Sequence, residues 1–153
     1  MQTETDKSQS ERTVESYKLN SAQTHHRDAW KIAGDLPSSF RYAWQGLVYS
    51  LKTQRNFRIH LLIGTFAIGA SIWLELSPNE FAIIVLTVSA VIILELINTS
   101  IEAVVDLAIG RRFHPLARIA KDCAAAGVLV ASCSSLLIGF LILIPPFLNR
   151  LGN

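Results

Sequence analysis

Residues 81 to 106 read FAIIVLTVSAVIILELINTSIEAVVD, an apolar run that ends in acidic and amide side chains. At roughly 100° per helical residue, Asn98 lies at about 300°, Glu102 at about 340° and Asp106 at about 20° from Glu95. These four residues, the polar row, therefore share one face of a predicted membrane-spanning helix. Ionisable groups inside such a helix cost free energy in lipid and mark functional sites, so the polar row is the main site candidate.

The composition is that of a membrane protein. Half of the 153 residues are apolar and 17% are charged, against roughly 25% charged residues in soluble domains. The net charge is only +2 and the basic residues are scattered, which argues against binding to nucleic acid. Cys123 and Cys133 lie about 15 Å apart along one predicted helix, beyond the reach of a disulfide, and we interpret them as buried thiols.

Two further apolar segments flank the central one. Residues 59–74 carry no formal charge, and residues 123–149 form an uncharged run that is the clearest transmembrane candidate. Pro145 and Pro146 are predicted to end the last helix. The three predicted spans cover about 57–75, 80–109 and 121–145.

The segment before the first span is predicted to be an amphipathic helix over residues 38–53. Its apolar residues recur at helical spacing: Phe40, Trp44, Leu47, Val48 and Leu51. Such a helix lies in the membrane interface or packs on other protein. Residues 1–37 are polar and predict a flexible cytoplasmic tail, in which His25 and His26 have no Cys or third His nearby to complete a metal site. The folded domain is therefore expected to cover 38–149.

Loop charges predict the orientation of the spans. Basic residues precede the first span and lie between the second and third: Lys52, Arg55, Arg58, Arg111, Arg112, Arg118 and Lys121. The loop between the first two spans carries only Glu75 and Glu80. The positive-inside rule then places the N-terminus in the cytoplasm, and the polar row ends at the cytoplasmic side of a multi-pass protein.

The polar row allows more than one chemistry. Glu102 and Asp106, four residues apart, can hold a hard cation such as Mg²⁺, with Glu95 about 10 Å deeper as a base. A polyphosphate could lie on the loop that follows, although the chain has no GxxxxGK[ST] or GxGxxG motif. Alternatively the carboxylates snorkel to the interface or pair with Arg111 and Arg112. Physical reasoning leaves these two alternatives about equal. A proton relay through Glu95, Glu102 and Asp106 is a further hypothesis, against which the basic loop argues.

The need to bury the Glu95 carboxylate also bears on whether copies of the chain associate. Three helices offer little interior in which to bury a carboxylate, so we predict that copies of the chain associate and enclose the polar row. Small residues such as Gly64 and Gly69 would allow helices to approach closely.

Residues 95–131, ELINTSIEAVVDLAIGRRFHPLARIAKDCAAAGVLVA, together with SFRYAWQGL and NFRIHLL, resemble the signature of the prokaryotic diacylglycerol kinase family. The resemblance covers residues 38 to about 131. It implies an all-α, homotrimeric integral membrane kinase of the inner (plasma) membrane, with an interfacial helix and three transmembrane helices per chain. The implied donor is MgATP and the implied acceptor is a membrane lipid alcohol.

The same resemblance implies residue roles. Glu95 matches the general base, Glu102 a metal ligand, and Asn98 and Asp106 supporting polar positions. The implied ATP contacts are Tyr42, Arg112, His114, Lys121 and Asp122.

The segment KTQRNFRIH departs from the family pattern because Gln54 stands where the family commonly has a metal-binding Glu. A neutral amide is a weaker ligand for a hard cation, so Gln54 is a second candidate ligand of reduced strength. We expect activity to be retained; a non-catalytic scaffold is the alternative. The stretch SFRYAWQGLVYSLKTQRNFRIH resembles the undecaprenol-type members of the family more closely, which favours undecaprenol slightly over diacylglycerol as the acceptor.

Overall fold

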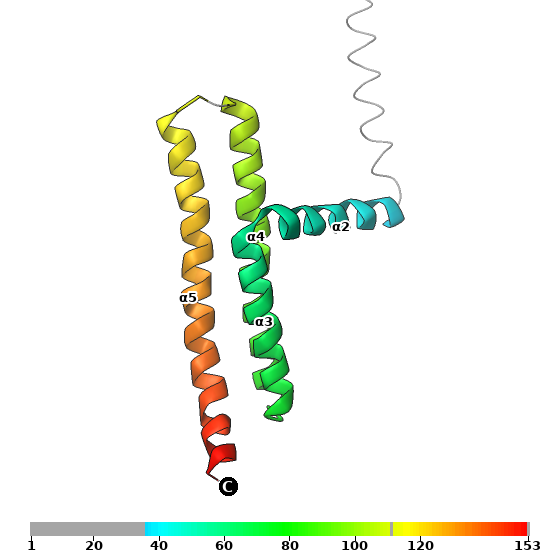
Figure 1. Ribbon diagram of the computed structural model, residues 1–153, viewed down its shortest axis with the longest axis vertical. Coiled ribbons are helices and arrows are strands. Elements are labelled where there is room, and N and C mark those ends of the chain that lie inside the picture. The colour runs from blue at the N-terminus through cyan, green and yellow to red at the C-terminus, as the bar shows by residue number, and fades with distance from the viewer. Residues whose placement is uncertain (1–35, 111, 153) are drawn as a thin grey trace, which may run out of the picture. The chain divides into compact units, whose positions relative to one another are not determined.

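The computed structural model describes residues 36–110 and 112–152, which form four helices and no strand (Figure 1). The helices are α2 (Leu36–Thr53), α3 (Arg55–Trp73), α4 (Pro78–Ile109) and α5 (Pro115–Leu151). The predicted all-α fold is confirmed. The chain divides into two units within α2, one ending at Gln45 and one beginning at Gly46. His25 and His26 lie outside the described residues.

Local signals define both ends of α4. Ser77 caps the N-terminus in a capping box with Glu80, and Pro78 occupies the first turn, where its missing N–H costs nothing. At the other end, Gly110 adopts a φ of 61° and donates its N–H to the Asp106 carbonyl. This backbone conformation favours glycine, so the helix stops there.

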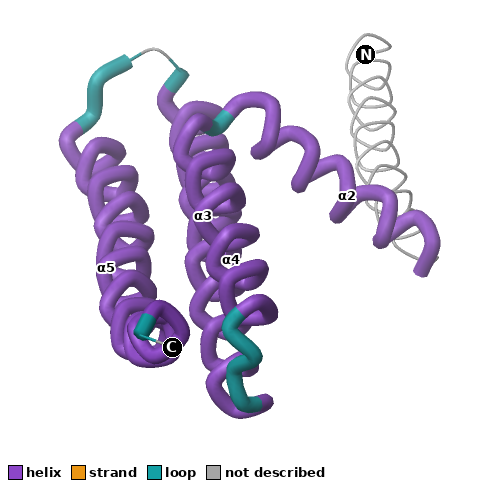
Figure 2. Tube along the Cα trace, turned by 60° about the horizontal axis from the view of Figure 1, so that its bottom comes forward, coloured by secondary structure: helices purple, strands orange, loops and turns teal. Residues whose placement is uncertain are grey.

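In the second unit, α4 packs against both α3 and α5, whereas α3 and α5 touch each other little (Figures 1 and 2). Helices α4 and α5 are long and apolar enough to cross a membrane. Few of their side chains are buried within the chain, as expected for helices that face lipid or other helices. The structure therefore supports a membrane protein with at least these two candidate spans.

Helix α5 continues through Pro145 and Pro146 to Leu151, so the prediction that these prolines end the helix is wrong. Each proline removes one N–H bond and crowds the carbonyl four residues earlier, and transmembrane helices tolerate this because neighbouring groups can satisfy the freed carbonyls. The last turn is also tied to α3, because Arg150 Nη1 donates to the Trp73 carbonyl at 2.8 Å. The Arg150 guanidinium lies 4.9 Å from the centre of the Trp73 ring.

The two cysteines also differ from expectation. Cys123 and Cys133 are free and exposed in the single chain, so their interpretation as buried thiols is wrong here. Both lie on the outward surface of α5, where lipid or another helix would cover them in a membrane.

Helices α3 and α4 approach each other closely at Gly64. A Cβ added there would lie 2.5 Å from Val88 Cγ1 on α4, whereas a Cβ at Gly69 meets nothing within 4 Å. Of the two α3 glycines suggested for close packing, only Gly64 serves the contact between α3 and α4.

We therefore predict that Gly64→Ala destabilises the protein by about 1–3 kcal/mol, because the added methyl group overpacks this contact. Gly69→Ala on the same helix is the matched control and should not lower stability. Thermal unfolding of both variants in detergent measures the difference. Equal midpoints for the two variants would contradict the assigned role of Gly64.

Candidate active site

Exposure increases along the polar row, from the middle of α4 to its end. Glu95 is 2% exposed, Asn98 and Glu102 are half-buried, and Asp106 is exposed. Because Glu95 is buried within a single chain, its shelter does not require a second copy. The physical argument for association drawn from Glu95 therefore fails.

Glu95 lies opposite a histidine of α3. His60 Nε2 is 3.3 Å from Glu95 Oε1, at ion-pair distance, yet Oε1 accepts no hydrogen bond from any described residue. The contact has the right length but not hydrogen-bond geometry. Sequence reasoning did not select His60, because it counted residues 59–74 as an uncharged span. An imidazole inside an apolar segment was the available signal.

Glu102 is the centre of a second cluster. Asn98 Nδ2 donates to Glu102 Oε1 at 3.2 Å, and Gln54 Nε2 donates to Glu102 Oε2 at a longer 3.5 Å. Gln54 occupies the break between α2 and α3 and makes no side-chain cap, so its amide can reach α4. The structure thus brings together Gln54, Asn98 and Glu102 in one hydrogen-bonded cluster. Asn98 Oδ1 is buried and accepts no hydrogen bond within the described chain.

Asp106, the last residue of the polar row, forms an ion pair with α5. Lys121 Nζ lies 2.5 Å from Asp106 Oδ1, so this carboxylate pairs with Lys121. Asp122 instead pairs with Arg118 at 3.5 Å, and both side chains are exposed. Neighbouring residues Lys121 and Asp122 therefore have different partners.

The remaining predicted ATP contacts are placed separately. His114 caps α5, its Nδ1 accepting the Leu116 N–H at 3.2 Å. Arg112 is exposed in the short segment before it. Tyr42 belongs to the first unit, where the Arg41 guanidinium lies 5.4 Å from its ring centre. Arg111 is outside the described residues.

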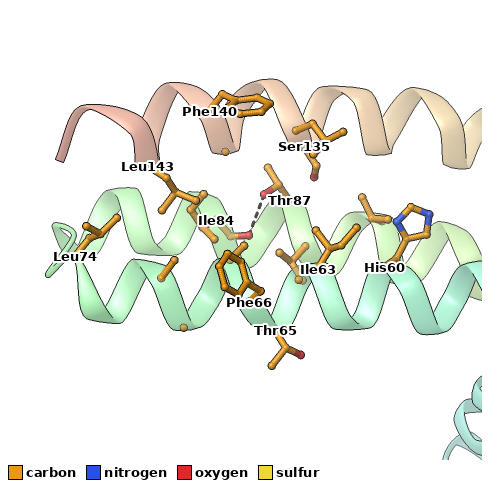
Figure 3. Close-up of a pocket in the computed structure, with 18 of the residues that line it drawn as sticks. His60, Ile63, Thr65, Phe66, Leu74, Ile84, Thr87, Ser135, Phe140 and Leu143 are labelled. Carbon is orange, nitrogen blue, oxygen red and sulfur yellow. Dashed lines mark hydrogen bonds between the residues drawn. The ribbon is translucent and has the colours of Figure 1, made fainter. Parts of the chain in front are cut away.

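An apolar cavity of about 930 Å³ lies among α3, α4 and α5. Its wall includes Ile63 and Phe66 of α3, Ile84 of α4, and Phe140 and Leu143 of α5 (Figure 3). His60 stands at one end of this cavity, away from the Leu74 end (Figure 3). The imidazole therefore connects the buried carboxylate to an apolar space large enough for a hydrocarbon chain.

Comparisons with known proteins identify the family of the chain. The chain is 48% identical over 123 residues to a diacylglycerol kinase of Synechocystis, covering 80% of this chain and 70% of the relative. It is 41% identical over 107 residues to the undecaprenol kinase of Bacillus subtilis, covering 70% and 86%. It is 34% identical over 90 residues to the diacylglycerol kinase of Escherichia coli, covering 59% and 73%. The family model for prokaryotic diacylglycerol kinase matches residues 41–143, and the chain belongs to this family.

Proposed function

We propose that this protein is a membrane lipid kinase that transfers the γ-phosphate of MgATP to the hydroxyl of a lipid alcohol. The observation that carries the proposal is the buried Glu95 carboxylate beside His60, which lines the apolar cavity. A carboxylate beside a residue that lines an apolar space can take a proton from an alcohol whose chain lies in that space. Family membership and the names of the relatives support the same activity.

On the acceptor side, Glu95 is the proposed general base. The lipid oxygen forms a bond to the γ-phosphorus, the bond from that phosphorus to the ADP oxygen breaks, and the hydroxyl proton passes to Glu95. The apolar cavity would hold part of the lipid chain. The hydroxyl of the bound lipid would then already be positioned for attack on the γ-phosphorus, which lowers the entropic cost of the reaction.

On the donor side, Glu102 is the proposed Mg²⁺ ligand, with Gln54 and Asn98 beside it. The described residues contain no cluster of three His, Cys, Asp or Glu that could cage a metal ion. This fits Mg²⁺ held with a nucleotide, since Mg²⁺ uses one or two carboxylates together with phosphates and waters. The bound ion would neutralise phosphate charge. The unpaired Asn98 Oδ1 is a further oxygen for this site.

The proposed ATP contacts are Lys121 and Asp122 on α5, Arg112 and His114 before it, and Tyr42. Lys121 is paired with Asp106 in the structure, so a polyphosphate would have to share or take over this ammonium group. Such exchange is feasible because the pair is partly exposed and phosphate carries more charge than one carboxylate.

The proposed setting is the plasma membrane, with the N-terminus in the cytoplasm. Helix α3 would form a third span beside α4 and α5, and α2 would lie in the interface. A homotrimer is proposed on the strength of the family resemblance.

The acceptor remains a choice between two lipid classes. The sequence wording favours undecaprenol, whereas the Synechocystis diacylglycerol kinase is more identical to this chain than the Bacillus undecaprenol kinase. The proposal therefore includes both lipids as candidates.

The deciding experiment offers radiolabelled ATP and Mg²⁺ to the purified full chain in mixed micelles, with diacylglycerol and undecaprenol side by side. We expect label in phosphatidic acid, undecaprenyl phosphate or both. Absence of labelled lipid with both acceptors would contradict the kinase and favour a scaffold. Proton flux into liposomes without ATP would instead support a proton pathway, although Glu95 lies against His60, Glu102 accepts from two amides and Asp106 pairs with Lys121.

A further inference from the structure

We propose that His60 is the positioning residue of the Glu95 carboxylate: its Nε2–H donates to Glu95 Oε1 and fixes the carboxylate for proton transfer. This inference rests on the proposed lipid kinase activity, in which Glu95 is the base. His60 itself takes no proton from the lipid in this scheme.

The first support is the unmet hydrogen-bonding capacity of Glu95. Its Oε1 is buried and accepts no hydrogen bond from the described residues, yet His60 Nε2 is only 3.3 Å away. A buried carboxylate oxygen without a donor is destabilised, so a donor at this distance should be used. A small rotation of the imidazole would convert the contact into a hydrogen bond, and such bonds often tighten only when substrate is bound.

The second support is the rigid backbone on which His60 stands. Phe57, three residues earlier, is 3% exposed, and Gly64, four residues later, packs directly against Val88 of α4. These residues and His60 share one face of α3. The face that carries His60 is therefore buried one turn before the imidazole and held against α4 one turn after it, which suits a group that must hold another in place.

The third support is the position of His60 between base and cavity. Its side chain is 23% exposed, whereas that of Glu95 is 3% exposed. The imidazole also lines the apolar cavity (Figure 3). Contact with one carboxylate oxygen from this side would leave the other oxygen to be aimed at an acceptor hydroxyl.

Two amide variants separate this role from general packing. The Nε2 of Gln reaches about as far as His Nε2, whereas the amide of Asn, one methylene shorter, does not. We expect His60→Asn to lower kcat about tenfold or more, with KM for ATP within about twofold, and His60→Gln to recover most of the loss. The assay is lipid phosphorylation by the full chain at saturating MgATP and acceptor.

Ser100→Ala, five residues after Glu95 on α4, is the control for removing a polar group from this part of the protein. Ser100 is exposed and its hydroxyl bonds to the Leu96 carbonyl of its own helix, so kcat should not change. A kcat for His60→Asn near that of the wild type would overturn the inference, as would a Gln variant no better than the Asn variant. Those results leave the kinase proposal intact, whereas an inactive wild type would overturn both.

Discussion

Glu95→Gln is expected to abolish lipid phosphorylation without unfolding the protein. The amide has nearly the same shape as the carboxylate but cannot take a proton from the acceptor hydroxyl. General-base catalysis contributes about 10²- to 10⁴-fold, so kcat should fall by at least two orders of magnitude. KM for ATP should change little, because Glu95 lies about 10 Å along the helix from Glu102. The measurement is initial rate against MgATP at saturating lipid.

The fold of this variant provides an independent check. Glu95 is 2% exposed and its Oε1 accepts no hydrogen bond within the described chain. Neutralising a buried charge with incomplete hydrogen bonding does not cost stability. We therefore expect Glu95→Gln to unfold at the same temperature as the wild type or higher, so that lost activity reports on chemistry.

Glu75→Gln is the matched control for the change from carboxylate to amide. Glu75 lies in the turn between α3 and α4, exposed and 3.9 Å from Arg150, and should keep full activity when changed. Full activity in Glu95→Gln as well would remove Glu95 from the role of base.

The sequence predicted the helices and the polar row because these features depend on local spacing. The apolar run before Glu95, the Ser77 cap and Gly110 each act on residues only a few positions away in the sequence. Asn98 and Glu102 are one turn apart, and their predicted common face is confirmed by their hydrogen bond.

Contacts between helices could not be predicted in the same way. Whether His60 meets Glu95 depends on how α3 packs on α4, and that packing depends on Gly64 against Val88. The sequence likewise could not show that one chain already buries Glu95. Similarly, the tie between Arg150 and Trp73 joins residues 77 positions apart, so the continuation of α5 beyond its prolines was missed.

Glu102→Gln is expected to lower the rate about 100-fold or more, because it leaves three amides and no carboxylate at the proposed Mg²⁺ site. Gln54, Asn98 and Glu102 form one hydrogen-bonded cluster, and Glu102 is its only anion. Mg²⁺ prefers carboxylate oxygens, and loss of the metal's charge stabilisation is worth several kcal/mol. The readout is rate against free Mg²⁺ at fixed ATP.

Moving the carboxylate tests the position of the ion. Gln54→Glu alone should lower the Mg²⁺ concentration needed for half-maximal rate by about tenfold, because a second anion joins Glu102.

In the double variant Gln54→Glu with Glu102→Gln, the cluster again has one carboxylate, now at the break between α2 and α3. Partial recovery of the Mg²⁺-dependent rate would show that both positions face the ion. A double variant as inactive as Glu102→Gln would show that Glu102 alone holds it, with nucleotide supplying the other ligands. A large gain in Gln54→Glu from a near-zero wild type would instead identify the wild-type chain as a scaffold that has lost its metal site.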